Sequence, residues 1–426
     1  MNILWLTNVA LPEASLLMHE KATPFGGWFV SASAALAEQD GIELSIAIPK
    51  NGLNDILVLN SERIKYYAFP PVSEKKVSLQ RNNLYLTKIL DEVRPDIVHI
   101  FGTEYAHTLG MVNACQEQNV KVVISIQGLT SIISGHYLTG IPVRVQNRFT
   151  VRDFLKQDNL IQQRSKFKKR GSFEIEALQK VNHVIGRTTW DRVCTSQINP
   201  DAQYHFCNET LRDEFYKHTW DVNQCEKHSI FVSQGSYPIK GLHFMLEAMP
   251  VILKRFADTT LYVGGQNITK TDTIKDTLKM SSYGKYIKEL IESYKLQNNV
   301  VFTGILDEKQ MCERYLKSHA FVCPSSIENS PNSLGEAMIL GVPCVASDVG
   351  GVADLLRHRE EGFVYQTDAP YMLAHYVSEI FANNELTLGF SKKAREHAMN
   401  THNRKKNMED IIKIYYNMSP TCKASG

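Results

Sequence analysis

Short apolar runs alternate with amphipathic segments along most of the chain, and this alternation predicts a succession of strands and helices. Several runs are apolar at nearly every position, as expected for parallel strands that are buried on both faces. The predicted strands are residues 3–6, 44–48, 96–101, 122–126, 183–186, 230–233, 261–263, 300–303, 320–323 and 344–346. The predicted helices include residues 29–37, 84–93, 242–256 and 404–417. The pattern is that of parallel α/β units.

The alternation stops once, in the middle of the chain, and then starts again. Residues 208–227 are polar and lack a sustained apolar period, which is typical of an interdomain linker. We therefore predict two Rossmann-like, doubly wound parallel-sheet domains at residues 1–207 and 228–403, with helix 404–417 packing back on the first. Ligands of such sheets bind outside the carboxyl ends of the strands. Two such domains facing across a cleft suit the joining of two substrates.

The composition agrees with two soluble globular domains. The chain has 426 residues, of which 43% are hydrophobic and 22% charged. Its net charge of +2 by itself forces no conclusion about nucleic acid, and we expect no nucleic-acid partner. Its eight cysteines lack C-x-x-C spacing, which favours free thiols in a reducing compartment over a zinc site. The N-terminus has no basic region, Pro12 and Glu13 interrupt its apolar stretch, and no apolar run reaches about 18 residues. We expect a cytoplasmic protein without a membrane span.

The most informative motif follows the predicted strand 320–323. Two carboxylates, Glu328 and Glu336, are separated by seven residues, and Glu336 lies in an apolar helix that ends at Gly341. If this helix begins near Asn332, both carboxylates line the crevice at the carboxyl end of a strand. The free backbone amides of the first helical turn would then be presented to an anion; they belong to Asn332, Ser333 and Leu334.

A second motif follows the predicted strand 230–233. Lys240 stands just ahead of the predicted helix 242–256, and Gly241 lets the backbone approach closely. A cation at this place can neutralise the charge that develops on a leaving diphosphate. A solvated surface lysine at a helix start is the alternative.

The segment from Glu328 to Glu336, with the Gly-Val-Pro-Cys-Val-Ala-Ser and Gly-Gly sequences after it, resembles the donor site of family-four retaining glycosyltransferases of the GT-B fold. The resemblance implies that Glu328 bonds hydroxyls of the transferred sugar and that Glu336 bonds the ribose hydroxyls. It also implies that the amides beside Ser333 bind the diphosphate and that Lys240 serves the phosphates. The sequences at 186–190 and 208–212 resemble a subgroup from bacterial capsular or surface polysaccharide clusters.

Three further donor-side positions follow from the resemblance. Ser236 stands where the family usually has a phosphate-binding arginine, so another basic side chain, such as Arg187, is a candidate to replace it. Gly26 and Gly27 resemble the glycine turn that faces the diphosphate, with an ordinary turn as the alternative. The residues beginning with Ile305 are expected to contact the base through backbone groups.

The acceptor side offers polar residues after two predicted strands of the first domain. Glu104 follows strand 96–101, and Gln127 and His136 follow strand 122–126. The family often has a histidine where this chain has Gln127. Glu104 or His136 is a candidate catalytic base, and ordinary polar loop residues are the alternative.

The resemblance implies retaining transfer of a sugar from a nucleotide diphosphate donor, UDP- or GDP-linked, to a glycan or polyprenyl-linked acceptor in surface polysaccharide synthesis. The chain has no Asp-x-Asp triplet, so we expect no metal and no cofactor. A nucleotide-sugar epimerase of the same fold and a non-catalytic glycan-binding protein are the alternatives. A dinucleotide-dependent oxidoreductase is disfavoured, because Gly-x-Gly-x-x-Gly does not follow the first strand.

One stretch, residues 141–171, is strongly basic and also rich in apolar residues. Basic residues with apolar partners are what a peripheral protein presents to an anionic membrane, here the inner face of the plasma membrane. A solvated loop and helix with its apolar side on the core is one alternative, and a cleft that attracts anionic substrates is another.

Overall fold

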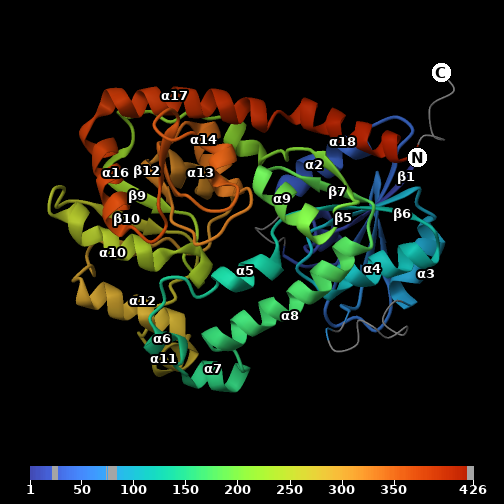
Figure 1. Ribbon diagram of the computed structural model, residues 1–426, viewed down its shortest axis with the longest axis horizontal. Helices are drawn as coiled ribbons and strands as arrows, with labels where there is room; N and C mark the ends of the chain where they lie inside the picture. Colours follow the sequence, from blue (N-terminus) through green and yellow to red (C-terminus); the bar gives the residue numbers. More distant parts are fainter. Residues whose placement is uncertain (22–26, 73, 75–83, 420–426) are drawn as a thin grey trace. The chain divides into compact units, whose positions relative to one another are not determined.

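The computed structural model describes residues 1–21, 27–72, 74 and 84–419, which form two compact α/β units (Figure 1). Unit 1 contains the described residues of Met1–Ile132, Lys168–Leu211 and His402–Gly426. Unit 2 contains Ile133–Phe167 and Arg212–Thr401. The predicted fold class, two doubly wound parallel-sheet domains, is confirmed.

Unit 1 is built on a sheet whose described strands follow the order β3-β4-β2-β1-β5-β6-β7-β8. All neighbouring strands are parallel except β3, which pairs antiparallel with β4 at one edge. The central strands β1 and β5 are buried almost throughout, because helices cover both faces of the sheet. The strands are β1 (Asn2–Leu6), β2 (Glu43–Pro49), β3 (Leu57–Asn60), β4 (Ile64–Phe69), β5 (Ile97–Phe101), β6 (Lys121–Ser125), β7 (His183–Gly186) and β8 (Gln203–Phe206).

Each face of this sheet carries its own apolar core. On one face the strands pack against α3, α4 and the end of α8, and on the other against α1, α2 and α18. The helix α18 lies beside α2 (Figure 1). The helices whose residues contribute to unit 1 are α1 (Pro12–Leu17), α2 (Gly27–Ala37), α3 (Leu84–Val93), α4 (Ala106–Glu117), α5 (Thr130–His136), α8 (Leu160–Gln179), α9 (Thr189–Ile198) and α18 (Arg404–Met418).

The last helix is joined to the centre of unit 1 by buried polar contacts. The hydroxyl of Tyr415 on α18 accepts a hydrogen bond from the indole of Trp5 at 3.0 Å and lies 2.5 Å from Nδ1 of His99. Nε2 of His99 lies 2.7 Å from the hydroxyl of Ser125. Burial lowers the pKa of His99 to about 3, so this imidazole is neutral at physiological pH. The expected packing of helix 404–417 on the first domain agrees with these contacts.

Unit 2 is built on a sheet whose described strands are all parallel, in the order β11-β10-β9-β12-β13-β14. Its strands are β9 (Glu226–Val232), β10 (Thr260–Val263), β11 (Val300–Phe302), β12 (Ser318–Cys323), β13 (Cys344–Ser347) and β14 (Gly362–Tyr365). Its helices include two 3-10 turns and are η2 (Asp213–Tyr216), η3 (Pro238–Lys240), α6 (Val143–Gln146), α7 (Val151–Lys156), α10 (Leu242–Leu253), α11 (Ile274–Lys279), α12 (Ser282–Ser293), α13 (Glu308–Leu316), α14 (Asn332–Leu340), α15 (Val352–Leu355), α16 (Pro370–Ala382) and α17 (Asn384–Thr401).

Every strand named from the sequence is present, and four strands were not foreseen: β3, β4, β8 and β14. The units also differ from the predicted domain bounds, because Ile133–Phe167 groups with unit 2. The boundary between Leu211 and Arg212 falls inside the predicted linker, residues 208–227, but these residues also contribute buried side chains. They bury Leu211, Phe215 and Trp220, and the Trp220 indole donates to the carbonyl of Ser318 at 2.8 Å.

Candidate functional site

In unit 2 the chain changes direction across the sheet between β9 and β12. From β9 the chain adds β10 and β11 on one side, and then crosses to β12 on the other side of β9. In doubly wound sheets the crevice for a ligand opens at this point, outside the carboxyl ends of the two strands. The loop after β9 leads to Lys240, and the loop after β12 leads to Glu328. The topology therefore brings two sequence-predicted residues to one crevice.

Lys240 and Glu328 form an ion pair there. Nζ of Lys240 lies 2.6 Å from Oε1 of Glu328, and the hydroxyl of Ser325 donates to the same oxygen at 2.7 Å. Both side chains are largely buried, with 23% of Lys240 and 12% of Glu328 exposed. Burial opposes the charge of Lys240, but the Glu328 carboxylate outweighs it and keeps the pKa of Lys240 above its usual value. Lys240 thus stays cationic although its side chain is largely buried.

Two glycines make this approach of the loops possible. Gly241 has a positive φ of 68°, and a Cβ there would lie 1.7 Å from the carbonyl oxygen of Pro324 at the end of β12. Gly350 has a φ of 54°, and its Cβ would lie 1.9 Å from the carbonyl oxygen of Glu328. The amide of Gly351 donates to that same oxygen at 3.1 Å. The Gly-Gly pair of the motif therefore positions Glu328 through the backbone.

The helix α14 begins at Asn332 and ends at Gly341, as predicted, with Gly341 in the left-handed conformation. One part of the prediction is wrong. The amide of Leu334 is not free, because it donates to the carbonyl of Pro331 at 2.9 Å and closes the first turn. For the amides of Asn332 and Ser333, the other two of the three, anion binding remains a prediction.

Glu336 lies one turn further along α14, and it is paired with Arg212, which the sequence reasoning missed. Nε and Nη2 of Arg212 donate to Oε1 and Oε2 of Glu336 at 2.7 and 2.8 Å, a bidentate arrangement. The guanidinium also stacks over the ring of Phe215 at 4.6 Å. Burial raises the pKa of the Glu336 carboxyl, and the Arg212 charge opposes this rise. A ribose diol bound here would use the remaining lone pairs of a carboxylate whose orientation is fixed.

The other predicted donor-side residues occupy separate places. Ser236 is half-buried in the loop between β9 and η3, and Ile305 is 56% exposed after β11. Gly27 starts α2 in unit 1, whereas Gly26 lies outside the described residues. Arg187, the candidate replacement for a phosphate-binding arginine, belongs to unit 1 and forms an ion pair there with Glu209.

Unit 1 has its own change of direction, between β1 and β5. Nδ2 of Asn8, after β1, donates to Oε2 of Glu104, after β5, at 3.0 Å. Oδ1 of Asn8 lies 2.6 Å from Nε2 of His107. Burial raises the pKa of Glu104 to about 7, and burial lowers the pKa of His107 to about 4. The predicted Glu104 therefore lies after β5, beside the change of direction, with its pKa raised close to neutral pH. Asn8 was missed, although it directly follows the first strand.

Gln127 belongs to a second polar group of unit 1. Its amide donates to Oε1 of Glu209, and Oε2 of Glu209 lies 2.7 Å from Nη1 of Arg187. The side chains of Arg187 and Glu209 are 4% and 10% exposed. Both line a cavity of about 40 Å³, together with Trp28 and other residues from β1, β5, β6 and α18. Gln127 therefore orients a buried ion pair beside this cavity.

His136 does not group with Glu104 and Gln127. It ends α5 in unit 2, where its backbone carbonyl accepts a hydrogen bond from the hydroxyl of Ser326 at 3.2 Å. Ser326 lies in the loop that carries Glu328, and its amide donates to the carbonyl of Ile239 at 2.8 Å. The predicted acceptor-side histidine thus lies beside the donor-side loop, because the chain enters unit 2 within α5.

Both halves of the chain match known glycosyltransferase families. Residues 214–397 match the family "Glycosyl transferases group 1", and residues 24–165 match "Glycosyl transferase 4-like". Among curated relatives, a putative glycosyltransferase of Bacillus subtilis, YtcC, is 27% identical over 163 residues, which are 38% of each chain. A poly(ribitol-phosphate) alpha-N-acetylglucosaminyltransferase of Staphylococcus aureus is 24% identical over 251 residues, 58% of this chain and 47% of that protein. The matches thus span less than half of the length of these two relatives.

The fold also has counterparts among solved structures. Anabaena Alr3699/HepE, solved in complex with UDP-glucose, superposes with a TM-score of 0.68 over 98% of this chain and 100% of its own, at 14% identity. At this identity the likeness concerns the fold. Together with the family matches, it indicates two GT-B-type domains.

Proposed function

We propose that this chain, whose two halves match glycosyltransferase family models and whose fold is similar to that of GT-B enzymes, transfers a sugar, with retention, from a nucleotide diphosphate sugar. The acceptor is a glycan or a polyprenyl-linked glycan of a surface polysaccharide. The observation that carries the proposal is the Lys240–Glu328 pair at the carboxyl ends of adjacent strands.

The pair supports this chemistry through charge. When a nucleoside diphosphate leaves the sugar, negative charge grows on its terminal phosphate, and a preorganised cation stabilises that charge most in the transition state. Lys240 is such a cation, and Glu328 beside it offers a carboxylate to sugar hydroxyls. The start of α14 adds the partial positive charge of a helix N-terminus. Leaving-group stabilisation in this proposal needs no metal ion.

The donor and acceptor classes have separate support. HepE was solved with UDP-glucose, which favours a UDP-linked sugar here over a GDP-linked one. The S. aureus relative is named for transfer of N-acetylglucosamine to poly(ribitol-phosphate), which favours a polymeric acceptor. Glu104 is the proposed base for the acceptor hydroxyl, since it lies after β5, beside the change of direction in unit 1.

The test begins with thermal shifts of the full chain in a panel of UDP- and GDP-sugars, because a ligand of the folded state raises Tm. The best donor is then incubated with and without glycan acceptors in the presence of EDTA. Acceptor-dependent release of nucleoside diphosphate, with an α-linked product from an α-linked donor, is expected. An isomerised nucleotide sugar formed without acceptor would contradict the proposal and establish an epimerase.

A further inference from the structure

The helix α7 (Val151–Lys156) has the reverse of the usual distribution of polar and apolar side chains. Its acidic residue Asp153 is fully buried, whereas Phe154 and Leu155 are 74% and 75% exposed. Val151, at the start of the same helix, is 53% exposed. Side chains of this kind are ordinarily buried, and a carboxylate is ordinarily exposed. The outward direction of the apolar residues of α7 therefore needs a reason.

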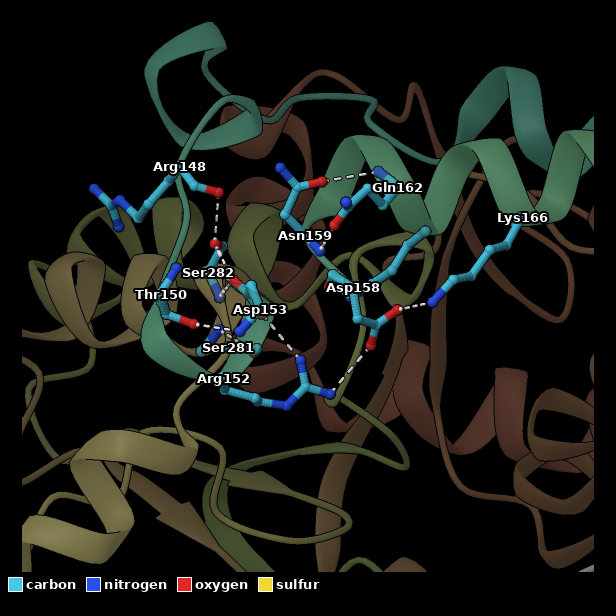
Figure 2. A network of polar contacts seen from close by, with 12 residues as sticks. Arg148, Thr150, Arg152, Asp153, Asp158, Asn159, Gln162, Lys166, Ser281 and Ser282 are labelled. Atoms are coloured by element: carbon cyan, nitrogen blue, oxygen red, sulfur yellow. Dashed lines mark hydrogen bonds and ion pairs between the residues drawn. The ribbon is translucent and has the colours of Figure 1, made fainter. Parts of the chain in front are cut away.

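Polar contacts hold α7 in this orientation (Figure 2). Oδ2 of Asp153 accepts from the amide of Ser282, in the first turn of α12, at 2.9 Å, and also from the Ser282 hydroxyl. Arg152 donates to Oδ1 of Asp153 at 3.0 Å, and Thr150 caps the helix through the Asp153 amide at 3.2 Å. A buried carboxylate bonded in this way is stable only in this geometry. The exposure of Phe154 and Leu155 is thus built into the structure.

The exposed apolar residues continue onto a neighbouring helix. The helix α11 packs against α7, and it exposes 82% of Ile274 and 48% of Leu278. The three short helices α6, α7 and α11 gather next to α12 (Figure 1). We call this surface the α7–α11 face; its apolar members are Phe149, Val151, Phe154, Leu155, Ile274 and Leu278.

The exposed charges on the helices α6, α7 and α11 are mostly positive, although Arg144 also lies 4.0 Å from Glu289 of α12. The exposed cations on these three helices are Arg144, Lys156, Lys275 and Lys279. The carboxylates on these helices are already engaged: Asp153 is buried, and Asp276 accepts from the hydroxyl and the amide of Thr273. Basic residues are attracted to the surface of an anionic bilayer, and apolar side chains enter the boundary of headgroups and acyl chains. The combination suits anionic lipid.

We propose that the α7–α11 face docks on an anionic lipid bilayer, with Phe154 and Leu155 inserted among the headgroups. The use of this contact, bringing unit 2 to a membrane-bound acceptor, rests on the proposed function, whereas the contact itself requires no catalysis.

The structure also changes which part of the basic stretch 141–171 carries this contact. Lys166 pairs with Asp158 at 2.9 Å, Arg170 pairs with Glu74 at 2.8 Å, and Arg148 pairs with Glu289 at 2.9 Å. Val145 and Leu160 are buried in the fold. These paired cations are poorer membrane contacts than an exposed cation such as Lys156, and α11 contributes to the face although it lies outside the stretch.

Cosedimentation with vesicles tests the proposal. The full chain should bind vesicles of phosphatidylglycerol and phosphatidylcholine at low salt, should ignore pure phosphatidylcholine, and should be released at about 0.5 M salt. The double change Phe154→Ser and Leu155→Ser should lower the partition coefficient roughly tenfold or more, because two exposed apolar side chains no longer insert. The matched control is Tyr371→Ser with Leu388→Ser, two exposed residues of α16 and α17 that should leave binding unchanged.

A charge series completes the test. Changing the four cations of the face to Gln should remove the preference for anionic vesicles; they are Arg144, Lys156, Lys275 and Lys279. The control removes four exposed lysines elsewhere in unit 2, namely Lys309, Lys317, Lys392 and Lys393, and should bind as the parent does. Absent binding by the parent at low salt, or unchanged binding by the double Ser variant, overturns the proposal. So does a parental dimer that the double Ser variant converts to a monomer in sedimentation velocity.

Because these assays contain no donor, they separate the docking surface from catalysis. Vesicle binding without acceptor-dependent transfer would retain the surface and reject the proposed function. Transfer to a soluble acceptor without vesicle binding would retain the proposed function and reject the docking surface.

Discussion

The two sheets place a glutamate at equivalent points, after the strand across the change of direction, yet the two carboxyl groups have opposite surroundings. In unit 2, Glu328 is paired with Lys240 at 2.6 Å. In unit 1, Glu104 is bonded to the neutral amide of Asn8, and burial raises its pKa to about 7. The first arrangement holds charge in place, and the second leaves a proton free to move near neutral pH. The same fold thus holds one glutamate in an ion pair and another whose pKa is raised to about 7.

The largest expected effect on turnover comes from removing the positive charge of Lys240 in unit 2. Lys240→Ala should lower kcat roughly 100- to 1,000-fold with a smaller change in donor KM, because the phosphate charge it meets grows in the transition state. Lys240→Arg should recover part of the loss, since the charge returns with a different geometry. Steady-state kinetics with the best donor measure both variants. Parental kcat in Lys240→Ala would remove this residue from the site.

Removing each of the two donor-side carboxylates should affect a different property: UDP binding for Glu336, and sugar transfer for Glu328. Glu336→Ala should weaken UDP binding roughly 10- to 100-fold, because a bond to the ribose is lost and Arg212 is left without its buried partner. Glu328→Ala should spare free UDP and lower transfer, since it serves the sugar. Isothermal calorimetry with UDP measures the affinities. Equal affinity of parent and Glu336→Ala would contradict the ribose assignment.

If Glu104 is the base, its ionisation should appear in the pH dependence of kcat/KM. With the Glu104 pKa raised to about 7, the carboxyl is protonated below that pH, so kcat/KM should rise through pH 7 as the base form appears. Glu104→Gln should remove this rise and lower the activity at pH 8 roughly tenfold. A profile unchanged in the variant would show that the rise belongs to another group.

The same raised pKa has a consequence for stability. An unfolded glutamate ionises near pH 4.5, so between that pH and about 7 the folded carboxyl retains a proton that the unfolded chain has lost. This group therefore makes the fold less stable as pH rises through that window. Glu104→Gln should raise Tm more at pH 8 than at pH 5, as measured by calorimetry. An equal shift of Tm at both pH values would contradict a buried carboxyl with a raised pKa.

The smallest effect is expected from chelation. EDTA should leave turnover close to that of untreated protein, because Lys240 and the start of α14 stabilise the leaving diphosphate in the proposal. Complete loss of activity that magnesium or manganese restores would refute the metal-independent proposal.

The structural features that the sequence predicts are formed by residues close together in the chain. Buried strands, the start of α14 and the glycine that ends it each follow from a few neighbouring residues. The strand β4 was missed, although it contains Tyr66, Tyr67 and Phe69, because Lys65 interrupts its apolar run. Prediction of Glu328 also depended on a compact motif, whose Gly-Gly pair lies in contact with it.

Contacts between distant residues could not be predicted. Arg212 and Glu336 are 124 positions apart, and Asp153 and Ser282 are 129 positions apart. Neither pair leaves a periodic signal, because the partners meet only when the chain has folded. The second pair is one of several contacts that join residues 133–167 to unit 2, and it fixes the side of α7 that is buried. The basic stretch was visible in the sequence, but its division into paired and exposed cations was not.

The bidentate contact of Arg212 with Glu336 also couples local order to ligand binding. The turn η2 packs against α14, and Arg212 directly precedes that turn. In the proposed donor complex, the nucleotide shares the Glu336 carboxylate with Arg212, the residue that precedes this turn. Thermodynamic reciprocity requires that whatever nucleotide does to the order of residues 212–216, their order does to nucleotide affinity. Amide hydrogen exchange of this short segment is therefore a reporter of donor occupancy that is independent of the chemical step.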